Sequence, residues 1–107
     1  MADTLQQVAA LVARGEVRVS EHGYDELAAD GMMLRDLVAG MAAAELVEDY
    51  PAFPKGPCVL VLQRDRDGNP VHALWGIPRG ESGPAVLVTA YRPDPKRWDA
   101  GLKRRLT

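Results

Sequence analysis

The sequence predicts a single α+β domain in which two or three N-terminal helices pack on a four-stranded, mostly antiparallel sheet. Two observations predict this fold class. Apolar side chains recur at helical spacing in the N-terminal part, whereas extended apolar runs separated by Pro and Gly follow from position 44. The 107 residues are enough for one domain with its own core, and they contain no repeat or interdomain linker. The domain is therefore expected to span residues 1–107.

Capping residues and apolar periodicity define the helices. Asp3 or Thr4 can cap the first helix, in which a stripe of apolar side chains precedes Gly15, which fits just past a helix end. Ser20 is the expected N-cap of the second helix, and Asp30-Gly31 ends it. Residues 17–19 are interpreted as a short extended link. The predicted helices span residues 3–14, about 21–29 and about 33–42.

The strands are predicted from apolar runs bounded by turn residues. Pro51 ends the first strand, and Asp67-Gly68-Asn69-Pro70 is a strong turn signal that makes the next two strands a hairpin. The near-continuous apolar run at 58–63 indicates a strand covered on both faces. The basic tail at 98–107 is expected to form one or two helical turns. The predicted strands span residues 46–50, 58–63, 71–77 and 85–91.

Charge divides the chain into two halves. Residues 1–50 hold ten acids and three bases, a net charge of −7, and residues 51–107 hold five acids and ten bases, a net charge of +5. This asymmetry is compatible with an anionic ligand or an acidic partner on the basic side. The alternative is that the two halves attract each other or are simply solvated.

Cysteine content and hydropathy indicate the cellular location that the sequence predicts. Cys58 is the single cysteine, so no intrachain disulfide can form, and it lies in an apolar run where it acts as a small hydrophobe. No stretch is long enough for a membrane span, and the N-terminus does not resemble a signal peptide. A cytoplasmic protein without membrane association is expected. No metal site and no cofactor are expected, since two histidines and one cysteine make no zinc set.

The end of the final strand carries the first candidate site residues. Tyr91 and Arg92 stand where Pro93 and Pro95 stop the ladder, because proline has no N–H to donate. A buried strand that opens into a fixed loop presents side chains from a rigid support. The residues expected to bind a substrate there are Lys96, Arg97 and Trp98, because cations match phosphate geometry and aromatic rings stack on bases.

The two histidines are the other candidates. His22 lies in the first turn of a predicted helix, where the helix dipole disfavours imidazolium and a neutral imidazole could act as a general base. Successive side chains of a strand point to opposite sides, and the more apolar side, which includes Val71, is expected to face the core. His72 is therefore expected to face the opposite surface or a groove. The alternatives are a His22 that covers the helix end and a His72 held by a backbone hydrogen bond.

Together these side chains suggest metal-independent RNA cleavage. His22 and His72 would serve as base and acid, Arg92 would stabilise the charged phosphorane, and Tyr91 would orient or stack. The alternative is that Arg92 pairs with Asp94 or Asp49 and fixes the loop. A second hypothesis is a non-catalytic interaction module, which binds an acidic partner protein through its basic face or a second copy through a sheet edge.

Four motifs carry a family resemblance. They are Ser20-Glu21-His22, Glu48-Asp49-Tyr50-Pro51, Pro70-Val71-His72, and Thr89-Ala90-Tyr91-Arg92-Pro93-Asp94 with Trp98. With them the chain resembles the family of domains of unknown function DUF4258 over about residues 17–98, which leaves residues 99–107 as a basic tail. Glu26 and Asp30 stand where relatives carry basic residues, so any RNA contact made by those basic residues is absent here.

The resemblance implies a function class. In element order, the family is similar to small RelE-like and BrnT-like ribonuclease toxins, often encoded beside zinc-finger antitoxin-like proteins. It therefore implies a toxin-like endoribonuclease of a toxin–antitoxin pair, with RNA as substrate and an antitoxin-like protein as partner. The implied function rests on similarity in element order and in neighbouring genes.

Overall fold

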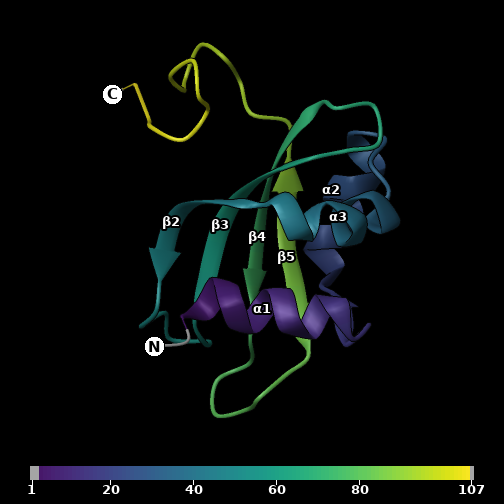
Figure 1. Ribbon diagram of the computed structural model, residues 1–107, viewed down its shortest axis with the longest axis vertical. Coiled ribbons are helices and arrows are strands. Elements are labelled where there is room, and N and C mark those ends of the chain that lie inside the picture. The colour runs from purple at the N-terminus through teal and green to yellow at the C-terminus, as the bar shows by residue number, and fades with distance from the viewer. Residues whose placement is uncertain (1–2, 107) are drawn as a thin grey trace.

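The computed structural model describes residues 3–106, which form three α-helices, one short 3₁₀ helix and one sheet of five strands (Figure 1). The helices are α1 (Thr4–Ala13), α2 (Glu21–Ala29), α3 (Leu34–Gly40) and the 3₁₀ helix η1 (Met41–Ala43). The strands are β1 (Val17–Val19), β2 (Glu45–Tyr50), β3 (Cys58–Arg64), β4 (Pro70–Gly76) and β5 (Ala85–Tyr91). The α+β class is confirmed.

The sheet has one more strand than the sequence predicts, and it is mixed. Its order is β1-β5-β4-β3-β2, and β1 pairs parallel to β5 with Val17 opposite Ala85. The short link predicted at residues 17–19 is extended as expected, but it pairs as a fifth strand, which the prediction of four strands missed. Three residues carry too little pattern to indicate a strand, and the partner of β1 lies far along the chain.

The predicted caps and the predicted turn are both confirmed. The Asp3 side chain accepts a hydrogen bond from the Gln6 backbone N–H, and Ser20 Oγ accepts one from Gly23 N–H. Ser20 also donates to the Val88 carbonyl at 2.8 Å, which fixes α2 to β5. Gly68 has φ +81° in the hairpin between β3 and β4, a conformation that favours glycine.

One face of the sheet packs against the helices, and we call it the helix face. Val71, Ala73 and Trp75 of β4 point to this side, as the alternation predicts, and they join a core with apolar residues of α1, α2 and α3. The polar side chain of Gln63 is buried beside this core, where its Oε1 accepts from Trp75 Nε1 and its Nε2 donates to the Leu37 carbonyl. This pairing satisfies both buried polar groups.

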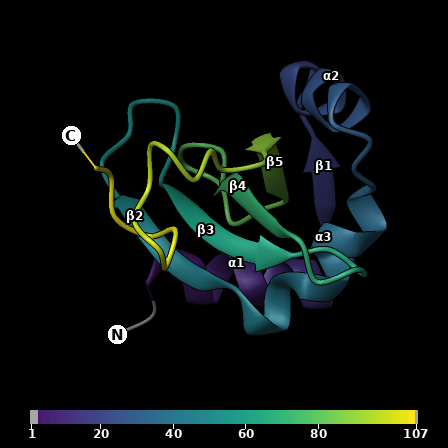
Figure 2. The same cartoon turned by 90° about the horizontal axis from the view of Figure 1, so that it is seen from above.

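The opposite face, which we call the open face, is covered only in part. Figure 2 shows α1 on one side of the sheet and the C-terminal segment, residues 93–106, on the other side. This segment lies over the end of the sheet at which β5 finishes (Figure 1). All six residues of β3 before Arg64 are buried, which confirms the prediction that this strand is covered on both faces.

The C-terminal segment does not form the predicted helical turns. Trp98 and Arg105 form an isolated antiparallel bridge, and Asp99 N–H donates to the Arg104 carbonyl. The segment folds back on itself because its side chains bind the sheet instead of forming an apolar helical stripe. Leu102 adopts φ +59°, in the left-handed region that non-glycine residues rarely occupy.

Candidate functional site

A cavity of about 690 Å³ lies between the end of β5 and the C-terminal segment, and we call it the tail pocket. Its lining residues are Tyr91, Arg92, Asp94, Lys96, Arg97, Trp98 and Arg105. All five candidate residues that the sequence places at and after the end of the last strand therefore line one pocket. Four cations and one carboxylate line it, so its surface favours an anion.

His72 lies behind the pocket and is fully buried. Its Nε2 is 2.6 Å from the Leu102 carbonyl oxygen, which can only accept, so Nε2 carries the proton. Burial lowers the pKa of His72, which keeps the ring neutral and leaves Nδ1 to accept from the Tyr91 hydroxyl at 3.1 Å. His72 thus faces away from the helix face as predicted, and a backbone hydrogen bond holds it, as the alternative interpretation states.

Two aromatic rings enclose the imidazole edge-on. The ring of Trp98 lies 4.4 Å from His72 and that of Tyr91 lies 5.3 Å away, both nearly perpendicular to it. Burial raises the pKa of Tyr91, so its hydroxyl stays protonated and continues to donate to His72. Trp98 is only 5% exposed, so it forms the wall between the pocket and His72 more than a free stacking surface.

Arg105 closes this arrangement from the C-terminal segment. Its guanidinium lies 4.8 Å from the centre of the Trp98 ring and pairs with Glu48 of β2 at 3.0 Å. Glu48 also accepts a 2.6 Å hydrogen bond from the Tyr50 hydroxyl. The hydrogen bonds from Arg105 and Tyr50 hold the pKa of Glu48 below its ordinary value. Arg105 is thereby fixed at the edge of the pocket.

Arg92 is fixed as well, by a partner that the sequence did not suggest. Its Nη1 lies 2.9 Å from Asp65 in the hairpin turn and 3.4 Å from the Pro70 carbonyl. Burial would raise the pKa of Asp65, but hydrogen bonds from the Asn69 backbone and from Arg92 outweigh it, so the pKa is lowered. The alternative that Arg92 fixes its loop is thus confirmed in kind, although neither Asp94 nor Asp49 is the partner.

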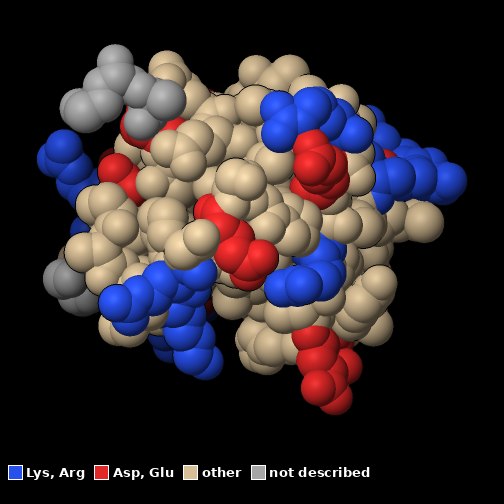
Figure 3. All heavy atoms as spheres, turned by 90° about the horizontal axis from the view of Figure 1, so that it is seen from below, with Lys and Arg blue, Asp and Glu red and all other residues tan. Residues whose placement is uncertain are grey.

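Lys96 and Arg97 are the accessible cations of the pocket. Arg97 lies 4.0 Å from Asp94 with its side chain 85% exposed, a weak pair that another anion can replace. Lys96 forms no ion pair within residues 3–106. At the opposite end of the molecule, Figure 3 shows basic and acidic side chains interspersed, with no such gathering of one sign among the described residues.

His22 is not part of this arrangement. It lies at the start of α2 with its side chain 65% exposed, and its Nε2 is 3.5 Å from Glu26. No contact joins it to His72 or Arg92 within the described residues, and it does not line the tail pocket. The structure therefore does not assemble the predicted pair of catalytic histidines. The helix-dipole argument for His22 and the strand-alternation argument for His72 each concerned a local setting, so they could not place the two histidines relative to each other.

Sequence reasoning missed the role of Arg105, which it counted only as part of a basic tail. Thirty-three positions separate Arg105 from His72, and no local pattern links them. A signal for its partner was present, because Glu48 and Tyr50 alternate on one face of a short strand inside a family motif. A carboxylate that becomes partly buried on that face is stabilised by a cation from another part of the chain, here Arg105.

The site can bind an anion, but it does not present a free histidine for proton transfer. Two arginines are held in place by carboxylates, and their remaining N–H groups can still donate. Both ring nitrogens of His72 are already bonded. No group of three His, Cys, Asp or Glu side chains arranged for a metal ion occurs in residues 3–106. None of the helices in that part of the chain is long and apolar enough to cross a membrane.

Fold and site together define a small α+β protein with a cationic pocket, one wall of which is the side chain of Tyr91, hydrogen-bonded to the buried His72. The family model described as domain of unknown function (DUF4258) matches residues 19–92, which is more than half of the chain. The chain therefore belongs to this family. No curated protein and no solved structure shows significant similarity to it. The family match ends at Arg92, so Trp98, Leu102 and Arg105 lie beyond it.

Proposed function

We propose that the protein binds single-stranded RNA, with phosphate groups in the tail pocket. The observation that carries this proposal is the gathering of Arg92, Lys96, Arg97 and Arg105 around one cavity, with the ring of Tyr91 at its wall. Arginine forks and lysine ammonium groups bind phosphate, and an aromatic ring beside them stacks on a base of any identity. Unpaired RNA offers both groups at once.

The arrangement of the cations favours this use. Asp65 and Glu48 hold Arg92 and Arg105 in fixed orientations, so little side-chain freedom remains to be lost on binding. Lys96 and Arg97 lie at the exposed rim, where an incoming phosphate meets them first. Rim charges of this kind act mainly on the association rate and its salt dependence.

A second candidate is a metal-independent endoribonuclease of a toxin–antitoxin pair, similar to RelE-like and BrnT-like toxins. The observation that favours it is the hydrogen bond from the Tyr91 hydroxyl to Nδ1 of His72, because Tyr91 also lines the cationic pocket. In this candidate Tyr91 accepts the proton of the RNA 2′-hydroxyl as its own proton passes to His72. The 2′-oxygen then attacks phosphorus as the bond from phosphorus to the 5′-oxygen breaks. The released 5′-oxygen takes a proton from water, and the hydroxide that remains takes the extra proton of His72 back through Tyr91.

One pair of measurements separates the two candidates. Fluorescence anisotropy with a 12-nucleotide labelled RNA measures binding, and gel analysis of the same RNA with and without chelator measures cleavage. We expect binding to fall at least tenfold in the Lys96→Gln/Arg97→Gln variant. Arg35→Gln, which removes an exposed cation from α3, should bind as wild type. Failure of wild-type protein to bind would overturn the RNA-binding proposal.

Cleavage needs its own controls. Chelator-resistant cleavage that Tyr91→Phe abolishes while binding persists would establish the second candidate. Intact RNA in every lane, together with binding, would leave the RNA-binding module alone. Induction in bacteria, alone and with the neighbouring gene, extends the comparison, because a toxin arrests growth and its partner restores it. Normal growth under induction alone would discard the toxin proposal.

A further inference from the structure

We infer that the open face docks an amphipathic helix of a partner protein, with acidic residues flanking its apolar stripe. The inference rests on a groove next to the tail pocket, and it does not depend on RNA binding there. It concerns the part of the open face that the C-terminal segment leaves uncovered.

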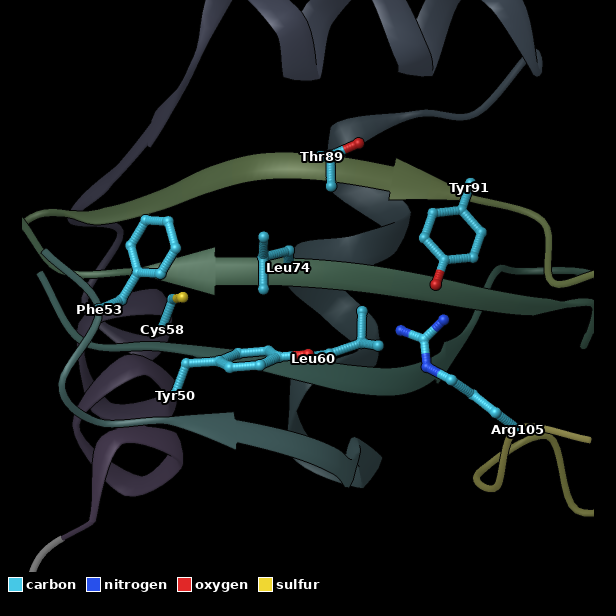
Figure 4. A pocket seen from close by; sticks show the side chains of 8 residues that line it. All are labelled: Tyr50, Phe53, Cys58, Leu60, Leu74, Thr89, Tyr91 and Arg105. Carbon is cyan, nitrogen blue, oxygen red and sulfur yellow. The ribbon is translucent and has the colours of Figure 1, made fainter. Parts of the chain in front are cut away.

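The groove consists of two adjoining hollows, of about 260 and 350 Å³, which share Phe53, Cys58 and Leu74. We call them together the sheet groove. Figure 4 shows the first hollow, with Phe53 near one end of the strands and Arg105 reaching in from the C-terminal segment. Tyr91 and Arg105 also line the tail pocket, so the sheet groove runs into it.

The floor of the sheet groove is apolar and spans three strands. It is formed by Cys58 and Leu60 of β3, Leu74 and Gly76 of β4, and Val86 and Val88 of β5. Neighbouring strands lie about 4.8 Å apart, so three strands span about 10 Å. That width matches the diameter of one α-helix with its side chains, about 10–12 Å.

Two aromatic side chains stand exposed at the wall of this floor. Phe53 is 50% exposed and Tyr50 is 37% exposed. Aromatic residues beside an apolar floor are enriched in the cores of protein interfaces, where they act as anchors. A groove of this composition is better suited to an apolar stripe of a partner than to water.

The charged side chains that line the sheet groove are all basic, although Arg105 is paired with Glu48 beside it. Arg18 and Lys55 line the second hollow and Arg105 lines the first, while no Asp or Glu among residues 3–106 lines either hollow. Arg18 and Lys55 also form no ion pair within that range. A helix with acidic side chains beside its apolar stripe matches the unpaired cations of the second hollow.

A second copy of the chain is the less suitable occupant. Two copies that met through their sheet grooves would bring the cations Arg18 and Lys55 of each copy together. The occupant is therefore assigned as a different, acidic chain. Because the sheet groove and the tail pocket share Tyr91 and Arg105, a docked helix would also narrow the entrance to the pocket.

Selection from a displayed library of random 16-residue peptides tests the inference without assuming a partner. The full-length protein is the bait, and enriched peptides are synthesised and titrated against it. We expect net-negative peptides with apolar residues at helical spacing of i, i+3, i+4 and i+7. Their affinity should fall at least tenfold in Phe53→Asp and in Arg18→Glu, both of which change exposed side chains. Met33→Asp, at 45% exposure on the helix side, is the matched control and should bind as wild type.

Each other outcome overturns the inference. These outcomes are no enrichment, enrichment of neutral or basic peptides, and acidic peptides whose affinity Phe53→Asp leaves unchanged. A wild-type dimer in light scattering that Phe53→Asp converts to a monomer would assign the groove to a second copy. RNA binding in the same variants is measured separately, so failure here leaves the RNA-binding proposal to its own test.

Discussion

The two faces of the sheet differ in the interactions that cover them. The helix face buries a continuous apolar core, in which Gln63 and Trp75 satisfy each other's polar groups. The open face buries His72 under a short irregular segment that contributes Trp98, and it holds that segment with ion pairs and side-chain hydrogen bonds. The helix face therefore sets the stability of the fold, while the open face places charged groups where a ligand can reach them.

The difference teaches how a small protein can carry a polar site without a polar core. Polar groups on the open face are paired with one another across distant parts of the chain, as in Arg92–Asp65 and Arg105–Glu48. Each pair is partly exposed, so it contributes little to folding and much to orientation. The following predictions test that division, from the largest expected effect to the smallest.

Loss of a tryptophan should lower the free energy of unfolding more on the helix face than on the open face. Trp75→Ala removes a fully buried side chain and leaves a closed cavity, which should lower the free energy of unfolding by about 3–5 kcal/mol. Trp98→Ala should cost about 0.5–3 kcal/mol, because the C-terminal segment can move and admit water. Urea unfolding measures both. Equal losses would contradict the proposed division between the faces.

Removal of the Tyr91 hydroxyl should lower the free energy of unfolding more than removal of an exposed tyrosine hydroxyl. Tyr91→Phe leaves Nδ1 of buried His72 without its donor, which should lower the free energy of unfolding by about 1–3 kcal/mol. Tyr24→Phe is the matched control, since Tyr24 is 61% exposed, and its effect should stay within about 0.5 kcal/mol. A Tyr91→Phe protein as stable as the control would show that the hydrogen bond adds nothing.

Stability should fall as the pH drops from 7.5 to 5.5 because of His72. Burial lowers the pKa of His72 in the folded state, so the unfolded chain takes up a proton below about pH 6.5 that the folded chain does not. The slope approaches at most about 1.4 kcal/mol per pH unit for one proton. In urea titrations, His72→Gln should flatten this dependence relative to the wild-type protein. An unchanged slope in His72→Gln would contradict the assignment.

Arg105→Gln should have the smallest effect on folding. The Arg105–Glu48 pair is partly exposed on both sides, so its loss should lower the free energy of unfolding by about 0–1 kcal/mol. RNA affinity should nevertheless fall severalfold, because the variant removes a cation from the tail pocket. A large loss of stability with unchanged RNA affinity would reverse the role assigned to this residue.

Much of the helix face could be predicted from the sequence. Ser20 and Asp3 mark the helix starts, and Val71, Ala73 and Trp75 alternate to the core, because both signals act over a few residues. The parallel pairing of β1 could not be predicted, since it joins residues 17–19 to residues 85–87. A three-residue strand has no periodicity of its own.

On the open face, the sequence predicted several of the site residues but not the contacts that join them. Tyr91, Arg92 and the residues that follow were found because a strand end, two prolines and clustered cations are local features. Arg92–Asp65, Arg105–Glu48 and the cover that Leu102 provides over His72 are tertiary contacts, which no local spacing encodes. The pairing of His22 with His72 failed for the same reason, because each was assessed in its own element.

The salt dependence of RNA binding tests the central claim most directly. If the four cations of the tail pocket each neutralise a phosphate, the logarithm of the binding constant should fall with the logarithm of salt concentration at a slope of about −2.8. Lys96→Gln/Arg97→Gln should reduce the magnitude of that slope by about 1.4, whereas Arg35→Gln should leave it unchanged. A slope that is the same in all three proteins would contradict the tail pocket as the RNA site.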